Sequence, residues 1–169
     1  MTKQSMELII DRLLEATKTP IGSPSWEAST WGKGELRLLW PLCIDNVPCQ
    51  ADLEINAYPT YGNSKEKWRI KLLVGRCIWR IDYVHDEHHI NSLDKRDDLI
   101  DYAFTAPHYH AWEDNKRFCT HNILPIDLPN ARIMPITCRT FPNALRWFCA
   151  ETNIVLPHMI DLPPRTMFL

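Results

Sequence analysis

The sequence contains no apolar run that approaches the ~20 residues needed to cross a bilayer, and the first five residues lead into no apolar signal core. We therefore expect no membrane segment and a soluble, cytoplasmic protein. The chain also lacks any block of five or more like charges, and its formal net charge is −2. This balance excludes a broad electrostatic footprint for nucleic acid and leaves only a local basic groove open.

Cysteine pairs at CxxC spacing are also absent, although the chain has six cysteines. They are typical of free thiols in a reducing cytosol. No internal repeat or low-complexity segment is present. What the sequence does contain is 45% hydrophobic residues and seven tryptophans in 169 residues, which predicts a globular protein. We expect a single domain that spans residues 1–169.

Hydrophobic periodicity predicts an α+β fold, with an antiparallel sheet of about five to six strands covered by the N- and C-terminal helices. Ser5 is the expected N-cap of the first helix. Residues 22–34, which include Trp26 and Trp31, are expected to be an irregular connection. The predicted segments are an N-terminal helix in 1–20, a sheet core with a His-rich site in 35–122, a proline-rich wrap in 123–142, a C-terminal helix in 143–154 and a tail in 155–169.

Two alternating runs between Trp68 and Val84 flank Gly75-Arg76 and predict a β-hairpin. In the predicted register, one face pairs Val74 with Cys77, Leu72 with Trp79, Ile70 with Ile81 and Trp68 with Tyr83. The opposite face pairs Lys71 with Arg80 and Arg69 with Asp82. That polar face is either a candidate site or a set of solvated ion pairs worth about 0–1 kcal/mol.

The segments 35–42 and 51–58 predict two further strands joined through Asp45-Asn46. Asp52 and Glu54 share the outer face of the second strand. With Asp82 they could bind a divalent cation, as metal-assisted displacement requires. The alternative is that they are ordinary polar residues on the solvent side.

The run from Pro107 to Trp112 predicts a strand on which His108 and His110 point to one side. A turn at Asp114-Asn115 and a return strand over 117–121 would place Cys119 opposite His110 and His121 opposite His108. Zinc takes imidazole nitrogen and thiolate sulfur, so this geometry predicts a zinc site of His108, His110, Cys119 and His121. The alternative is that the histidines bond neighbouring strands and Cys119 is a buried apolar residue.

Three more histidines follow the first hairpin, at positions 85, 88 and 89. Histidine is the side chain suited to proton transfer near neutral pH, so a cluster at a strand end favours a site. Surface decoration is the competing interpretation.

Several short motifs occur in a characteristic order: Arg80-Ile81-Asp82, then His89-Ile90-Asn91, then Pro107-His108-x-His110, and a final helix with Leu-Arg-Trp-Phe-Cys. This order resembles a family of small uncharacterised bacterial and phage proteins, the domain of unknown function 6978. The resemblance extends from about Leu8 to Ile154, and the sequence departs from the family by carrying His88 where the family has proline. A looser similarity exists to toxins of the TumE type.

The resemblance implies a fold and an origin on bacterial or mobile-element genomes, and no activity. It excludes Cys119 and His121 from the shared polar residues, which are Arg80, Asp82, His89, Asn91, His108 and His110.

Three functional hypotheses follow. The first is an enzyme that cleaves at phosphorus, such as a ribonuclease-like toxin or defence factor. Its catalytic residues would be His108, His110, His89, Arg80, Asp82 and Asn91, with the histidines as acid and base and Arg80 stabilising developing charge. The second is a non-enzymatic protein-binding factor, such as a phage-encoded inhibitor of host defence. The third is a zinc-binding protein. The expected partner is accordingly a protein or RNA, and the oligomeric state stays open.

Overall fold

The structure is a computed structural model that describes residues 5–30, 34–58, 66–92, 97–99, 102–120 and 123–163. A long hairpin of β3 (Leu36–Ile44) and β4 (Val47–Tyr58) forms one half of its main sheet. The two strands meet at Asp45 and Asn46, whose φ angles of 50° and 66° are typical of a tight hairpin turn. Both strands extend further toward this turn than the sequence predicts.

The second hairpin of the sheet joins β5 (Lys67–Val74) to β6 (Arg76–Tyr83). Five residue pairs at its open end form as predicted, including Arg69 with Asp82 and Lys71 with Arg80. The predicted pairing of Val74 with Cys77 is wrong. An irregularity between Leu72 and Leu73 shifts the register, because the chain turns at Gly75 (φ 66°) and Val74 pairs with Arg76.

The predicted fold class is confirmed: the chain is α+β, with antiparallel pairing throughout the main sheet. Its order is β1-β3-β4-β5-β6-β9-β10, with β2 paired to β3, so the described residues give the main sheet eight strands. The strand β9 (His108–His110) falls within the predicted run from Pro107 to Trp112. Three short strands were not predicted: β1 (Thr19–Pro20), β2 (Trp26–Ala28) and β10 (Arg132–Ile133). A separate two-stranded sheet contains β7 (His88–Ile90) and β8 (Ala103–Thr105).

The expectation of a wholly irregular connection over residues 22–34 is wrong, because Trp26 belongs to β2. Trp31 lies outside the described residues.

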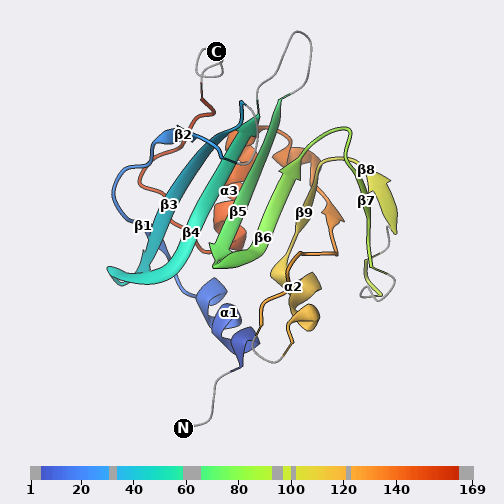
Figure 1. Ribbon diagram of the computed structural model, residues 1–169, viewed down its shortest axis with the longest axis horizontal. Coiled ribbons are helices and arrows are strands. Elements are labelled where there is room, and N and C mark those ends of the chain that lie inside the picture. The colour runs from blue at the N-terminus through green and yellow to red at the C-terminus, as the bar shows by residue number, and fades with distance from the viewer. Residues whose placement is uncertain are drawn as a thin grey trace.

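Two helices support the sheet (Figure 1). In α1 (Met6–Glu15), the Ser5 side chain accepts a hydrogen bond from Leu8 N at 3.3 Å, which confirms the predicted N-cap. This helix ends before residue 20, because Thr19–Pro20 joins the sheet as β1. The C-terminal helix α3 (Phe141–Glu151) lies behind the sheet in Figure 1. Three shorter helical segments are α2 (Trp112–Asn115), η1 (Lys116–Phe118) and η2 (Ile136–Cys138).

The apolar face of the sheet packs against α3 and forms the core. Trp68 of β5 contacts Phe141 edge to face, and Trp79 of β6 contacts Phe148 in the same way. Ile160 of the tail also joins this core, and residues 164–169 lie outside the described part. All six cysteines are free, as predicted. None of the described helices is long and apolar enough to span a membrane.

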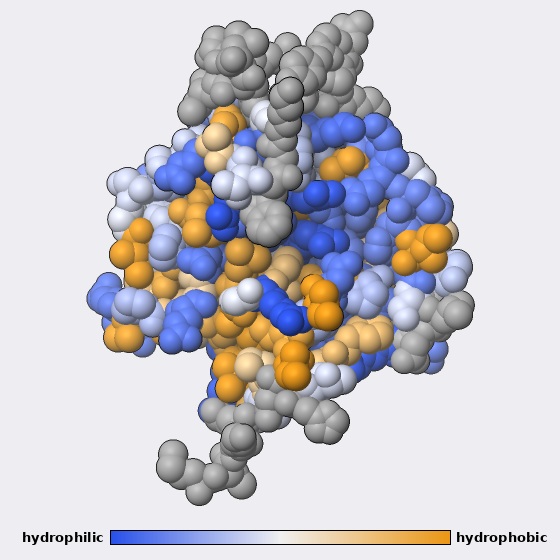
Figure 2. Space-filling view, in the orientation of Figure 1, coloured by the Kyte–Doolittle hydropathy of each residue, from blue (hydrophilic) through white to orange (hydrophobic). Residues whose placement is uncertain are grey.

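The opposite face of the sheet carries charged and polar side chains in register across its strands. One row runs Arg37, Asn56, Arg69, Asp82 and His108, from β3 to β9. Figure 2 shows hydrophilic residues gathered over the middle of this face and hydrophobic surface below them. The row is partly covered, since Asn56, Asp82 and His108 are buried.

Candidate functional site

Strand pairing brings four of the predicted site residues together. The antiparallel register of β6 and β9 places Arg80 opposite His110 and Asp82 opposite His108. Because alternate residues of a strand share a face, all four side chains lie on the polar side of the sheet.

Asp82 is the centre of this group. Its side chain is 1% exposed and accepts hydrogen bonds from Arg69 Nε and Arg80 Nε, each at 2.6 Å. His110 Nε2 lies 3.1 Å from Asp82 Oδ2, and His108 Nε2 lies 3.6 Å from the same oxygen. Burial alone would raise the pKa of Asp82, but the His110 hydrogen bond and the two guanidinium charges hold it well below its ordinary value. Asp82 is therefore an ionised, buried carboxylate.

Three imidazoles converge beside Asp82. His89 reaches the group from β7, outside the main sheet, and its ring centroid is 4.9 Å from that of His108 and 5.0 Å from that of His110. The His108 and His110 centroids are 5.1 Å apart. One nitrogen of each ring lies within 4.8 Å of the others, so the group could hold a metal ion. His108 and His110 are buried, and His89 is half-buried.

Hydrogen bonds orient these rings differently. His108 Nδ1 lies 2.8 Å from the main-chain oxygen of Ala106, and His89 Nε2 lies 3.0 Å from Asn91 Oδ1. Main-chain oxygen only accepts, so His108 carries its proton on Nδ1 and its other nitrogen faces Asp82. His110 Nδ1 is buried and has no hydrogen-bond partner. His110 is thus oriented through one ring nitrogen and has the other left over, which is the usual state of a metal-ligating histidine.

Burial also keeps two of the rings neutral. It lowers the pKa of His110 to about 4, assisted by the Arg80 charge and opposed by Asp82. For His89, burial and the neighbouring His108 lower the pKa, against hydrogen bonds to Asn91 and the Pro129 backbone. Neutral imidazole is the form that binds metal.

Asn91 links the site to the proline-rich segment through two hydrogen bonds. Its Nδ2 donates to Ala131 O at 3.0 Å, and its Oδ1 accepts from Ala131 N at 2.7 Å. The side chain thus ties β7 to the proline-rich segment, where Asp127 also contacts Arg80 at 3.3 Å. Sequence reasoning missed Asp127 and Ala131, because no spacing relates them to the histidines.

The predicted second hairpin is wrong. Asp114 and Asn115 belong to α2, and β9 pairs with β6 and β10 instead of a return strand. The expected turn residues anchor the helix: Asn115 Nδ2 donates to Ala111 O and Asn130 O, and Asp114 binds Arg132.

Among the described residues, Cys119 is not part of the group that could hold a metal ion, and its thiol contacts the main-chain oxygen of Ile123 at 3.3 Å. His121 lies outside the described residues. His89 takes the third position instead.

Two other candidate groups are not assembled in the described part of the chain. Glu54 is neutralised by Arg37 and by Lys71 at 2.8 Å, so Asp52, Glu54 and Asp82 form no shared carboxylate site. His88 contacts Thr105 at 3.1 Å and His85 packs edge-on against Tyr83, so neither belongs to the imidazole group.

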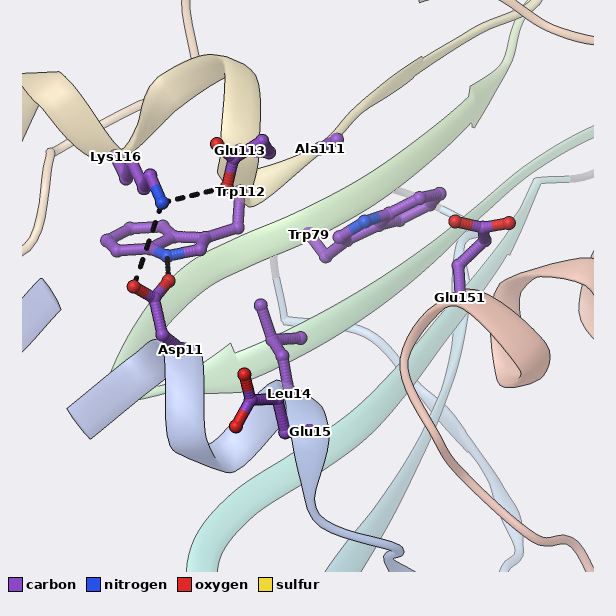
Figure 3. A pocket seen from close by; sticks show the side chains of 9 residues that line it. All are labelled: Asp11, Leu14, Glu15, Trp79, Ala111, Trp112, Glu113, Lys116 and Glu151. Atoms are coloured by element: carbon purple, nitrogen blue, oxygen red, sulfur yellow. Dashed lines mark hydrogen bonds and ion pairs between the residues drawn. The ribbon is translucent and has the colours of Figure 1, made fainter. Parts of the chain in front are cut away.

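A separate pocket of about 380 Å³ lies between α1, α2 and the end of α3 (Figure 3). Trp79 and Trp112 line it, and Lys116 bridges Asp11 and Glu113 at its edge. None of the sequence-predicted site residues lines this pocket. The predicted site residues therefore gather at the imidazole group and not at this pocket.

Comparison with known proteins adds no relative to this picture. The resemblance drawn from the short motifs stays a prediction. No protein-family model matches the chain, no curated protein matches it, and no solved structure matches it.

Proposed function

We propose that His89, His108 and His110 bind one zinc ion. Zinc is suited to imidazole nitrogen, with Zn–N distances of about 2.0–2.1 Å, which correspond to about 3.3 Å between ligand atoms in a tetrahedral site. The three nitrogens lie within 4.8 Å of one another, so binding zinc requires them to approach by up to about 1.5 Å. His89 is half-buried and lies in the small β7-β8 sheet, so it is the ring with most room to move.

The unpartnered His110 Nδ1 carries this proposal. Both Asp82 Oδ2 and Arg80 Nη2 lie close to the other ring nitrogen, at 3.1 and 2.9 Å. Arg80 Nη2 can only donate and Asp82 Oδ2 can only accept, so each ring tautomer satisfies one of these two contacts. A metal ion at Nδ1 selects the tautomer with the proton on Nε2, which donates to Asp82. A buried polar atom left unpaired costs about 1–3 kcal/mol, which metal coordination through Nδ1 would remove. Asp82 would then support His110 as carboxylates support many zinc ligands.

We further propose that the reaction is hydrolysis of a phosphoester, with RNA as the substrate class. Three protein ligands leave a fourth position, in which zinc supplies Lewis acidity and an activated water. Arg80, bonded to Asp82 and adjacent to His110, is placed to stabilise negative charge that develops on a phosphate. A toxin or defence factor of a bacterial or mobile element, the setting suggested by the motif resemblance, is consistent with this chemistry.

Metal content tests the site directly. Elemental analysis of the purified protein should find one zinc per chain, and cobalt substitution should give the visible absorption of a tetrahedral site. His89→Ala and His110→Ala should each lose the metal. His85→Ala and His88→Ala are matched controls from the same stretch and should keep it. A protein that holds no metal and binds none on titration contradicts the zinc proposal.

Cleavage of an RNA oligonucleotide and of bis(p-nitrophenyl) phosphate tests the reaction. We expect hydrolysis that chelation abolishes and zinc restores. Cleavage that needs His108 and His110 but no metal would support metal-free acid–base catalysis instead. Bound zinc without cleavage would make the site structural and favour the protein-binding alternative, in which partner capture survives loss of the imidazoles.

A further inference from the structure

A second polar site lies on the same face of the sheet, away from the imidazoles. It is a cavity of about 560 Å³ over β3, β4 and β5. This volume is within the usual range for small-molecule sites, about 300–1,000 Å³. Its lining residues are Glu35, Arg37, Glu54, Asn56, Tyr58, Arg69 and Lys71. None of these lining residues is a proposed zinc ligand.

Asn56 is the unusual residue of this cavity. It lies on β4 between Arg37 and Arg69 in register, the residue is 3% exposed, and its Oδ1 has no hydrogen-bond partner. A buried amide oxygen without a donor costs about 1–3 kcal/mol, so such atoms are uncommon unless something outside the fold satisfies them. Asn56 Oδ1 therefore points to a ligand that donates a hydrogen bond.

The charges around Asn56 are largely paired. Arg37 and Lys71 both bind Glu54, and Arg69 binds Asp82 and Glu87 beside the cavity. The lining itself has three cations and two carboxylates, Glu54 and Glu35, before Asp82 and Glu87 are counted. Because the cations already have carboxylate partners, the cavity has little preference for a strongly anionic ligand.

Donors and acceptors nevertheless alternate closely along the cavity. Lys71 Nζ has three protons and donates one of them to Glu54 Oε1 at 2.8 Å. Glu54 Oε1 has a second lone pair beyond the one that Lys71 uses, whereas Oε2 is contacted by both Nε and Nη2 of Arg37. Tyr58 O–H accepts from Arg69 at 3.0 Å and is also bonded to Glu35. Hydroxyl groups match such a lining best, because each donates and accepts at once.

We infer that this cavity binds a sugar ring through neighbouring hydroxyl groups, one of which donates to Asn56 Oδ1. The ring is uncharged, which agrees with a lining whose cations already have carboxylate partners, and its hydroxyls satisfy the carboxylate and ammonium groups together. A free saccharide and the ribose of a nucleoside or RNA share this chemistry.

Saturation-transfer NMR on the full chain tests the inference with glucose, galactose, mannose, ribose, uridine and 2′-deoxyuridine as probes. Transfer to the ring protons of a hexose supports a free saccharide. Transfer to uridine but not to 2′-deoxyuridine supports the ribose of RNA. Absence of transfer to every probe overturns the inference.

Variants locate the binding. Asn56→Leu removes the acceptor at nearly constant volume and should weaken binding of the responding sugar at least about tenfold, the equivalent of one hydrogen bond of ~1.4 kcal/mol. Its melting temperature should not fall, since the orphaned oxygen is gone. Asp52→Asn, on the same face of β4 but outside the cavity lining, should bind as the wild type does.

Equal affinities of wild type and Asn56→Leu would overturn the inference. If that variant does not fold, Lys71→Met is the second test and should weaken binding at least about threefold. His89→Ala should bind the sugar normally, so failure of the zinc proposal and failure of this inference are distinguishable.

Discussion

Asp82→Asn should be among the most destabilising conservative substitutions in this protein. The carboxylate is 1% exposed and accepts from two guanidinium groups at 2.6 Å. Removing one partner of a buried ion pair typically costs about 3–5 kcal/mol, because the opposite charge remains without compensation. Arg69 and Arg80 are partly solvated, so we expect the low end, about 3 kcal/mol.

Urea unfolding followed by tryptophan fluorescence measures this loss. With a slope of ~2 kcal/mol per molar urea, the midpoint should fall by about 1.5 M. Chelator should be present throughout, since a metal bound to the folded state would add stability of its own.

Two other carboxylates on the same arginines are matched controls. Glu87 binds Arg69 at 2.9 Å and Asp127 binds Arg80 at 3.3 Å, but they are 39% and 72% exposed. Solvated pairs contribute about 0–1 kcal/mol, so Glu87→Gln and Asp127→Asn should hardly move the midpoint. An Asp82→Asn midpoint that matches these controls would refute the reasoning from burial.

Three further predictions concern other parts of the chain. Lys18 is buried, its Nζ donates to Leu13 O and Ala16 O, and burial lowers its pKa to about 8. Between pH 8 and 10.5 the unfolded chain holds the Lys18 proton and the folded chain does not. The free energy of unfolding, relative to that of Lys18→Met, should therefore rise by about 2 kcal/mol from pH 7.5 to 9.5. A difference between the two proteins that does not change with pH would contradict this prediction. Phe148→Ala should lower the free energy of unfolding in urea by about 3–5 kcal/mol, because the ring is fully buried against Trp79. A loss below about 1 kcal/mol would contradict this, since it would mean that neighbouring side chains fill the cavity. Burial raises the pKa of Cys149 to about 12, so its thiol should resist Ellman's reagent at pH 8 until the protein is unfolded, and rapid native reaction would contradict this.

Local patterns predicted much of the fold. The alternation of β5 and β6 predicted the pairing of Arg69 with Asp82, because a period of two assigns every side chain to a face once the register is set. The same argument failed at Val74, where the turn at Gly75 and a bulge shift the last pairs. A shift of one residue at the turn changes which residues pair there, and hydrophobic periodicity does not determine where the turn lies to within one residue.

The second hairpin shows a different limit. Asp114-Asn115 has the composition of a turn, but its side chains bond Asn130 and Arg132, about 15 residues further along the chain. Long-range partners of this kind outweigh a local preference for a turn, and no short-range pattern reports them.

What the sequence by itself determined is local: the α+β class, the two long hairpins, the first helix with its Ser5 cap, and the shared face of His108 and His110. These follow from capping and alternation, which act between near neighbours. Only the tertiary structure decided that β9 pairs with β6, that His89 completes the imidazole group in place of Cys119, and that Asp82 is buried beneath two arginines. The physical reason is that contacts between distant segments depend on the packing of the whole chain.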